Sequence, residues 1–327
     1  MISADADSLF SFLPTWEHNR EQIVKNIVSR PGYLKFIIKV RDELHLLTEW
    51  LLHHTEIVDH QDIIIFDNRS EDPQLADFYK SLPPDIVVAR YDALHNTIHN
   101  TDLFPELYEA LARSCVYFAF LDCDEYLIHI DENLVANRTV IVDVLKNNYR
   151  YDVHPCTWLN NGLCSRDLYE CSSSHRLGEM LYSGKPVIRS KAGCSGWLLH
   201  NYSIEKKFIS GDNLPKFFVQ HRLNLFPELR VRATLVKMAA EKLIPPDWSA
   251  ERTIKHDFSG IKDPGVHRYI SELKKLSTTY APATMESGFV NIKLRKRLEF
   301  FSGIERDAFL EFRLPWDYNF VQRYLGI

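Results

Sequence analysis

Short apolar segments alternate with segments of helical periodicity over the first 150 residues of this chain. The apolar segments have the length and the content of β-branched and aromatic residues that are typical of buried strands; they are residues 33–40, 62–68, 85–91 and 115–122. Because strands that alternate with helices form mainly parallel sheets with right-handed crossovers, we expect an α/β fold. Neither GxGxxG nor GxxxxGK[ST] occurs, so the dinucleotide fingerprint and the P-loop are not indicated.

The pattern divides the 327 residues into three regions. Residues 1–30 are expected to form an amphipathic, mostly helical lead-in, and residues 31–225 the α/β domain. The later part of that domain, from about 150 to 225, is rich in Cys, Ser, Asn, Gly and His and is expected to form loops that cover a site. Residues 226–327 are expected to form a helical C-terminal region, with helices at 229–243, 264–280 and 290–312.

The charge balance argues against nucleic acid as a partner. The 39 Lys and Arg residues are outnumbered by 44 Asp and Glu residues, so the net charge is −5, whereas a nucleic-acid binder needs a basic surface. No apolar run approaches the roughly 18 to 20 residues of a membrane span, and the N-terminus lacks the features of a secretory signal. The six Cys residues form no CxxC pair and no zinc spacing. We therefore expect a cytoplasmic protein with free thiols and no transmembrane segment.

Polar residues follow the ends of three predicted strands. Ligands of parallel sheets bind beyond the carboxyl ends of the strands, so residues 39–43, 67–72 and 122–125 are expected to line one site. Asp122 and Asp124 are spaced to face the same side of an extended segment, where they can hold Mg²⁺ or Mn²⁺. The DxD pattern alone is weak, because chance produces it often. The position of Asp122 directly after an apolar strand favours the metal-site interpretation.

Other residues fit a metal and phosphate site, each with a simpler alternative. Asp67 is a candidate acceptor of hydrogen bonds from a base or a ribose, or a cap of the following helix. His200 and His221 follow apolar segments and are candidate metal ligands, or structural histidines. Lys185 and Arg189 belong to a basic segment that can neutralise a diphosphate leaving group, or lie solvated at the surface.

Taken in order, these segments resemble the glycosyltransferase family 2 / family 92-like group over about residues 33–225. The positions that match its three motifs are Glu43, Glu49, Trp50, His53 and His54, then Asp67, Asn68, Ser70 and Asp72, then Asp122, Asp124 and Glu125. The chain departs from the pattern at Asp42, where Asn is usual, at residues 160–162, which replace a common Phe-Gly, and at Arg222, which replaces Tyr. These departures concern the acceptor site more than the donor site.

The resemblance implies a GT-A fold, in which a Rossmann-like nucleotide-binding half is joined to an acceptor-binding half. It implies a nucleotide-sugar donor, with a UDP-sugar favoured, Mn²⁺ or Mg²⁺ as cofactor, and inversion at the anomeric carbon. By resemblance, Asp122 and Asp124 contact the ribose and the metal. The donor-binding residues that it implies are Glu43, Asp67, Asp122, Lys185 and Arg189. The expected acceptor is a glycan or a lipid-linked glycan of bacterial surface polysaccharide synthesis, at the inner face of the membrane.

An inverting transfer also needs a base near the acceptor hydroxyl. The candidates are Asp167, Glu170 and Glu179, and the sequence does not choose among them. Two other function classes use similar residues: a metal-dependent phosphohydrolase and a non-catalytic sugar-binding protein of GT-A fold. Two-metal hydrolases usually need clustered Asp and His motifs, which this chain lacks, and the intact DxD pattern disfavours the non-catalytic class.

A basic segment near the C-terminus is a candidate peripheral membrane contact. Residues 293–297, Lys-Leu-Arg-Lys-Arg, place four cations in five positions, and Phe300 and Phe301 follow. Such a cluster can lie on anionic lipid, with each cation contributing about 1 kcal/mol. The alternative is a solvated helix face whose cations pair with Glu299 and Glu305.

Overall fold

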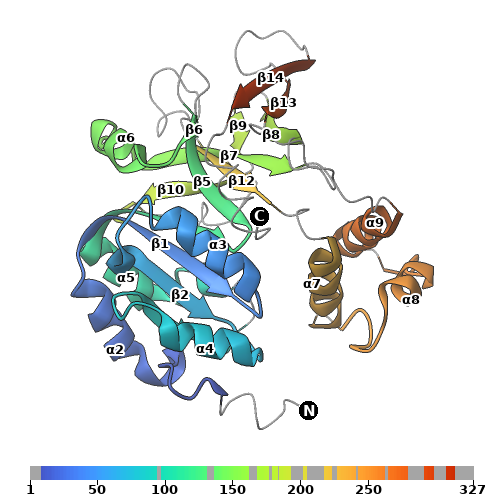
Figure 1. Ribbon diagram of the computed structural model, residues 1–327, viewed down its shortest axis with the longest axis horizontal. Coiled ribbons are helices and arrows are strands. Elements are labelled where there is room, and N and C mark those ends of the chain that lie inside the picture. Colours follow the sequence, from blue (N-terminus) through green and yellow to red (C-terminus); the bar gives the residue numbers. More distant parts are fainter. Residues whose placement is uncertain are drawn as a thin grey trace.

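The computed structural model describes residues 9–93, 97–130, 136–161, 168–176, 179–182, 184–192, 202–204, 217–222, 227–240, 242–261, 264–278, 291–297 and 307–313. Helices flank a sheet whose first half is parallel (Figure 1). The α/β fold class that the sequence predicts is therefore confirmed.

Four parallel strands form the first half of the sheet. They are β1 (Gly32–Val40), β2 (Ile63–Asp67), β3 (Val87–Arg90) and β4 (Cys115–Asp122), in the spatial order β3-β2-β1-β4. Each coincides with one of the predicted apolar segments. The two inner strands of the four, β1 and β2, are buried over all or most of their length, as expected of parallel strands with helices on both faces.

Helices cover both faces of these strands (Figure 1). They are α2 (Trp16–Val28), α3 (Leu44–His54), α4 (Pro73–Ser81) and α5 (Pro105–Ser114), with 3₁₀ turns at His60–Asp62 and Thr97–His99. Because successive side chains of a strand point to opposite faces, neighbouring residues of β1 enter different hydrophobic clusters. Phe36 shares one cluster with Trp50 of α3, and Ile37 shares the other with Leu107 of α5.

Antiparallel strands continue the sheet beyond β4. β10 (Gly184–Arg189) pairs with β4, and β7 (Val153–Asn161) pairs with β10. The outer strands are β8 (Leu168–Arg176), β9 (Glu179–Tyr182) and β11 (Tyr202–Ile204). The expectation of loops over 150–225 is wrong for these segments. These strands cannot be recognised from their polar composition, because strand formation here depends on pairing with neighbouring strands and not on an apolar run.

A second group of strands lies next to this extension. It contains β5 (Glu125–Ile130), β6 (Ala136–Asn137) and β12 (Phe217–His221), and α6 (Ile141–Asn147) follows β6. β12 pairs antiparallel with β5 and parallel with β7, so it joins the two groups. His221 at the end of β12 consequently lies opposite Glu125 at the start of β5.

Three helices form a separate group to one side of the sheet (Figure 1). They are α7 (Pro227–Ala240), α8 (Ala250–Lys255) and α9 (Pro264–Thr278). The group has its own small core of Met238, Ile244, Phe258, Val266 and Leu273. The prediction of a helical C-terminal region is confirmed for this part of the chain. None of the helices in the described ranges is long and apolar enough to cross a membrane.

The prediction of a helix at residues 290–312 is wrong. β13 (Asn291–Arg297) and β14 (Asp307–Arg313) are strands that pair antiparallel, and β13 also pairs parallel with β8. Ile292 and Leu294 alternate with cations, which is the period of a strand and not of a helix. The basic residues 293–297 therefore lie on β13 rather than on a helix face, and their contact with a membrane stays a prediction.

A buried ion pair lies near the amino end of β1. Lys35 Nζ is 2.7 Å from Asp62 Oδ1, and the side chain of Lys35 is 1% exposed. Gly32 makes room for the partner, since a Cβ at this position would lie 1.9 Å from Asp62 Oδ1. The ion pair therefore depends on glycine at position 32.

Two buried histidines join α3 to β5. His53 Nε2 lies 2.7 Å from the carbonyl oxygen of Leu127, and the Leu127 N–H donates to His54 Nε2 at 3.4 Å. His54 Nδ1 lies 2.9 Å from the carbonyl oxygen of Trp50. Burial lowers the pKa of His54 to about 3 and lowers that of His53 well below its ordinary value. Both rings are consequently neutral at physiological pH, and together they hold both backbone groups of Leu127.

We expect Gly32→Ala to lower the free energy of unfolding by about 3 kcal/mol, because the added methyl group displaces Asp62 and leaves Lys35 as an uncompensated buried charge. Urea unfolding measures the loss. Gly260→Ala is the matched control, since nothing lies within 4 Å of a Cβ at that position. Equal unfolding free energies for the two variants would contradict the close contact between Gly32 and Asp62.

We expect stability to fall on acidification because of His53 and His54. Below about pH 6.5 the unfolded chain binds protons at these histidines, whereas the folded chain binds them only at much lower pH, so each costs about 2 kcal/mol by pH 5. His54→Gln should be less stable than wild type at pH 7 and should lose less stability between pH 7 and pH 5 in urea unfolding. His60→Gln, at an exposed histidine, should keep the wild-type pH dependence. Identical pH dependence in His54→Gln and wild type would count against a neutral buried ring.

Candidate active site at the carboxyl end of the parallel strands

The carboxyl ends of the four parallel strands bring charged residues into two adjacent rows of the sheet. Asp122 of β4 lies opposite Lys39 of β1, and Asp67 of β2 lies opposite Arg90 of β3. The chain runs from β1 outward through β2 to β3 and then returns to place β4 on the other side of β1. This reversal is a topological switch point, where open α/β sheets bind their ligands.

Asp122 lies between two buried lysines. Lys185 of β10 forms an ion pair with Asp122 Oδ2, and Lys39 Nζ lies 3.4 Å from Asp122 Oδ1. Burial lowers the pKa of Lys39 to about 8, although Asp122 acts in the opposite direction. Burial also disfavours the charge on Lys185, but the carboxylates of Asp122 and Glu125 outweigh this effect and raise its pKa above the ordinary value. The resemblance assigns both Asp122 and Lys185 to the donor site; the structure places them in contact, and their binding of a donor stays a prediction.

Glu125 is fully buried and binds three groups. Its Oε2 lies 2.9 Å from Lys185 Nζ and accepts a hydrogen bond from the Asp122 N–H at 2.9 Å. Its Oε1 accepts one from Trp158 Nε1 at 2.9 Å. Burial raises the pKa of Glu125, and Lys185 opposes that shift. Glu125 thereby fixes the turn between β4 and β5.

Asp124 pairs with His221 rather than with the lysines. His221 Nε2 lies 3.3 Å from Asp124 Oδ2, and the indole of Trp158 stacks on the imidazole of His221 with 4.6 Å between ring centroids. Burial raises the pKa of Asp124, but the interaction with His221 outweighs it and lowers the pKa to about 2. The same contact raises the pKa of His221 against the effect of its burial. Each partner therefore favours the charged form of the other.

Glu43 stands before the first turn of α3, close to the DxD turn. Burial and the neighbouring charge of Asp124 raise the pKa of Glu43 to about 7. A carboxyl group with this pKa exchanges a proton near neutral pH, which is a common property of active-site acids and bases. The membership of Glu43 in the donor site stays a prediction.

The DxD pattern spans a turn, and this corrects the expectation of an extended segment. Asp122 is the last residue of β4, Asp124 lies in the turn, and β5 begins at Glu125. Among the described side chains, no three of the types His, Cys, Asp and Glu lie close enough together to hold a metal ion by themselves. Mg²⁺ and Mn²⁺ often take only one or two carboxylates together with substrate phosphates. The two carboxylates fit a metal that binds together with a phosphate ligand.

Asp67 is buried and supports the loop that follows β2. Its Oδ1 accepts a hydrogen bond from the Ser70 N–H at 3.0 Å, and its Oδ2 accepts one from the Tyr79 hydroxyl at 3.1 Å. The cap of α4 is Asp72, whose side chain accepts from the Gln74 N–H at 2.9 Å. Asp67 has no exposed surface in this conformation. It therefore positions the strand end, and its direct contact with a nucleoside stays a prediction.

The other predicted site residues fall into three groups. Arg189 lies at the far end of β10, opposite Tyr117 and 3.5 Å from Asp152, so the structure does not bring it to the cluster. Asp167 and His200 lie outside the described residues. For Glu170 and Glu179 only the backbone is described, at positions on β8 and β9.

His99 is a site residue that the sequence-based search did not select, and Lys39 lies in the range 39–43 expected at the site but is given no role there. Lys39 Nζ lies 3.0 Å from His99 Nε2, and both residues are buried. A lysine inside an otherwise apolar strand is a usable signal, because a buried cation needs a partner. That signal also marks Lys35 and cannot by itself separate a structural lysine from a functional one.

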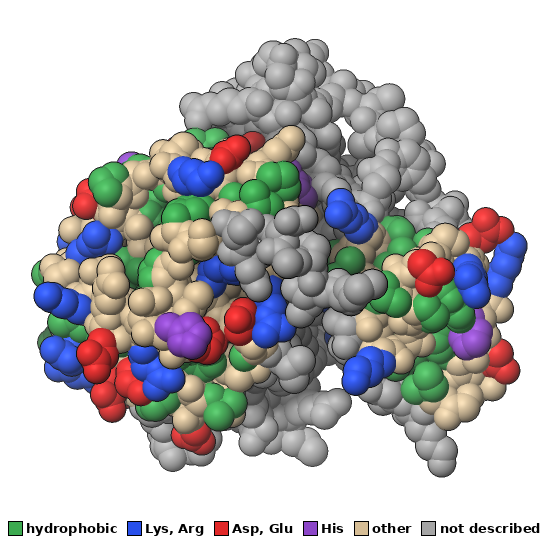
Figure 2. Space-filling model, turned by 90° about the horizontal axis from the view of Figure 1, so that it is seen from below, with side chains coloured by type: hydrophobic (Ala, Val, Ile, Leu, Met, Phe, Trp, Pro, Cys, Tyr) green, Lys and Arg blue, Asp and Glu red, His purple; other side chains and the backbone are tan. Residues whose placement is uncertain are grey.

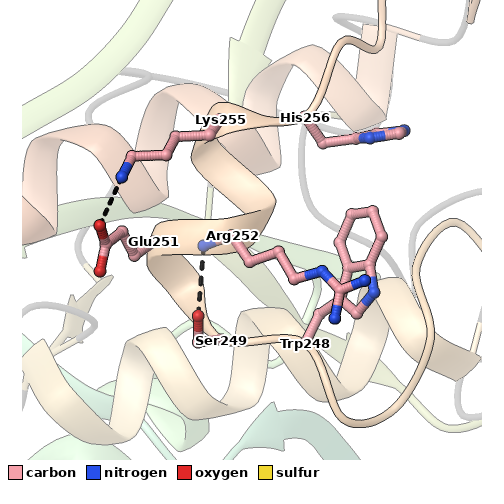
Figure 3. A pocket seen from close by; sticks show the side chains of 6 residues that line it. All are labelled: Trp248, Ser249, Glu251, Arg252, Lys255 and His256. Atoms are coloured by element: carbon pink, nitrogen blue, oxygen red, sulfur yellow. Dashed lines mark hydrogen bonds and ion pairs between the residues drawn. The ribbon is translucent and has the colours of Figure 1, made fainter.

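On the face that Figure 2 shows, acidic and basic side chains of the described residues are interspersed over the sheet domain and the helical group. A hollow of about 490 Å³ lies at α8, lined by Trp248, Ser249, Glu251, Arg252, Lys255 and His256 (Figure 3). Arg252 lies over the Trp248 ring and Lys255 pairs with Glu251, so these side chains bind one another.

No protein-family model matches the chain, and no curated protein matches it. Solved structures that resemble it in part include S. aureus TarS 1–349, with 12% identity over 76% of this chain and 73% of that chain and a TM-score of 0.31. The same fragment in complex with UDP covers 85% of this chain and 98% of that chain, with 12% identity and a TM-score of 0.30. The match to a 4-diphosphocytidyl-2C-methyl-D-erythritolsynthase from Anaerococcus prevotii covers 94% of this chain and 99% of that chain, with 8% identity and a TM-score of 0.28. These TM-scores are too low for the likeness to indicate an activity.

We expect Glu125→Ala to lower the free energy of unfolding by about 3 kcal/mol, because it removes a buried acceptor from Lys185, from the Trp158 indole and from the Asp122 N–H. Urea unfolding measures the loss. Glu109→Ala, at an exposed carboxylate of α5, should change stability by less than about 0.5 kcal/mol. A Glu125→Ala protein as stable as the Glu109→Ala protein would show that Glu125 does not hold the cluster together.

Proposed function

We propose that this protein is a glycosyltransferase that moves a sugar from a nucleotide-sugar donor to a glycan or lipid-linked acceptor. The observation that carries the proposal is the cluster at the switch point, where two buried lysines contact the carboxylate of Asp122 and Asp124 lies in the adjoining turn. A parallel sheet with helices on both faces supports a nucleotide-binding crevice at this edge. The GT-A type of fold is part of this proposal.

The charges suit the departure of a nucleoside diphosphate. When a sugar leaves such a donor, negative charge grows on the diphosphate, and fixed cations in a site with little water lower the free energy of that transition state. Lys39 and Lys185 supply two such cations from neighbouring strands. A bound Mn²⁺ or Mg²⁺ at Asp122 and Asp124 would add Lewis-acid stabilisation of the same oxygens.

An acceptor base completes an inverting transfer. Asn160 of β7 lies opposite Glu170 of β8 and also opposite His221 of β12, which in turn lies opposite Glu125. Glu170 therefore belongs to the same row of backbone positions as two members of the cluster. We favour Glu170 over Asp167 and Glu179 as the base for this reason.

The acceptor and the location are proposed on the resemblance alone. The proposed acceptor is a precursor of a bacterial surface polysaccharide, glycosylated at the cytoplasmic face of the membrane. A UDP-sugar is the favoured donor. The cations of β13 are the proposed membrane contact, and co-sedimentation with anionic and neutral vesicles would test it.

We expect Asp124→Asn to reduce sugar transfer by at least about 100-fold, because loss of a carboxylate weakens binding of the metal and its diphosphate. The assay supplies Mn²⁺, a panel of nucleotide sugars and candidate glycan acceptors, and circular dichroism checks the fold. Asp143→Asn, at an exposed carboxylate that pairs with Lys146 on α6, should keep wild-type activity. Wild-type transfer in Asp124→Asn would contradict the DxD assignment. Release of phosphate without any sugar product would favour the phosphohydrolase.

A further inference from the structure

Asp122 lies on the middle strand of three neighbouring strands. Its carboxylate contacts a lysine from each of the two outer strands. The strand order is β10-β4-β1, with Lys185 on β10 and Lys39 on β1. The lysine side chains are 2% and 3% exposed, whereas the Asp122 side chain is 33% exposed. The carboxylate of Asp122 thus lies on the open side of both ammonium groups.

Both lysines need an anion at this position. Without Asp122, Lys185 would keep the carboxylate of Glu125 but lose that of Asp122, and Lys39 would lose the carboxylate that lies 3.4 Å from its Nζ. A buried ammonium group that loses its counter-ion is strongly unfavourable, so the carboxylate can leave only when another anion takes its place. An anion with several oxygen atoms can contact both lysines at once.

The contacts of Asp122 allow its side chain to move while its backbone stays in place. The Asp122 N–H donates to Glu125 Oε2, and Glu125 is fully buried. The lysines extend from two strands inside the sheet and are enclosed by it. The partly exposed carboxylate is therefore the member of the group that can move by a change of rotamer.

We propose that Asp122 is an internal substitute for the donor diphosphate: its carboxylate occupies the anion position between Lys39 and Lys185 in the free protein, and an incoming diphosphate displaces it. The identification of that diphosphate as part of a nucleotide sugar rests on the proposed function. Displacement releases the Asp122 carboxylate toward the exposed side, where it becomes available to a divalent cation. Diphosphate and cation then strengthen each other's binding to the same degree, as linkage requires.

Inorganic pyrophosphate tests this exchange without any assumption about the nucleoside, the sugar or the acceptor. Isothermal titration calorimetry in the absence of metal compares wild type with Asp122→Asn, which keeps the size of the side chain and removes its charge. We expect Asp122→Asn to bind pyrophosphate at least fivefold more tightly than wild type. Equal or weaker binding by Asp122→Asn, or no binding by either protein, would overturn the proposal.

The lysines supply a second measurement. Lys39→Gln should bind pyrophosphate at least fivefold more weakly and should bind Mn²⁺ alone more tightly than wild type, because Asp122 loses a competing partner. The control is Asp62→Asn, at the other buried lysine pair of β1, which should leave both affinities unchanged. Loss of Mn²⁺ affinity in a folded Lys39→Gln protein would overturn the exchange. Since the experiment measures binding only, failure of sugar transfer would count against the proposed function and leave the exchange standing.

Discussion

The ion pairs of Lys185 with Asp122 and Glu125 join the parallel half of the sheet to the antiparallel half. Lys185 belongs to β10, the first antiparallel strand, and its partners end β4 and begin β5. The turn between β4 and β5 places three carboxylates within four residues, and their mutual repulsion would oppose such a turn in the absence of cations. One buried ammonium group therefore stabilises both the change of strand direction and the conformation of the DxD turn.

Two further contacts fix the position of β5 relative to this cluster. His53 and His54 bind the backbone of Leu127 from α3, and Trp158 of β7 donates to Glu125 while it stacks on His221. The first contact fixes β5 from the helix side, and the second fixes it from the antiparallel strands. The cluster therefore depends on elements that are distant in the chain, and few of these contacts could be read from local sequence.

Strands could be predicted from the sequence where burial makes their residues apolar. They could not be predicted where a strand is stabilised mainly by pairing with its neighbours. All four parallel strands follow from their apolar runs. The contact of Asp122 with Lys185 could not be derived in the same way, because Lys185 lies near the start of an antiparallel strand. The polar strands between 150 and 225 were missed because each is stabilised by its neighbours in the ladder. At residues 290–312 the sequence analysis predicts a helix, although apolar residues alternate there with cations at the period of a strand. The sequence offers Asp67 as a ligand contact or as a helix cap, whereas its side chain accepts hydrogen bonds from Ser70 and Tyr79 and Asp72 caps the helix.

β1 carries two buried lysines on the same face, four residues apart, and their surroundings separate a structural role from a functional one. Lys35 pairs with Asp62, whose side chain is 9% exposed and is confined by Gly32. Lys39 lies near Asp122, whose side chain is 33% exposed. Both lysines need a counter-ion, but only the second carboxylate has open space beside it. Lys35 therefore forms a closed structural ion pair at the amino end of β1. Lys39 lies beside an anion position that can exchange its occupant, at the carboxyl end of β1, where α/β sheets bind their ligands.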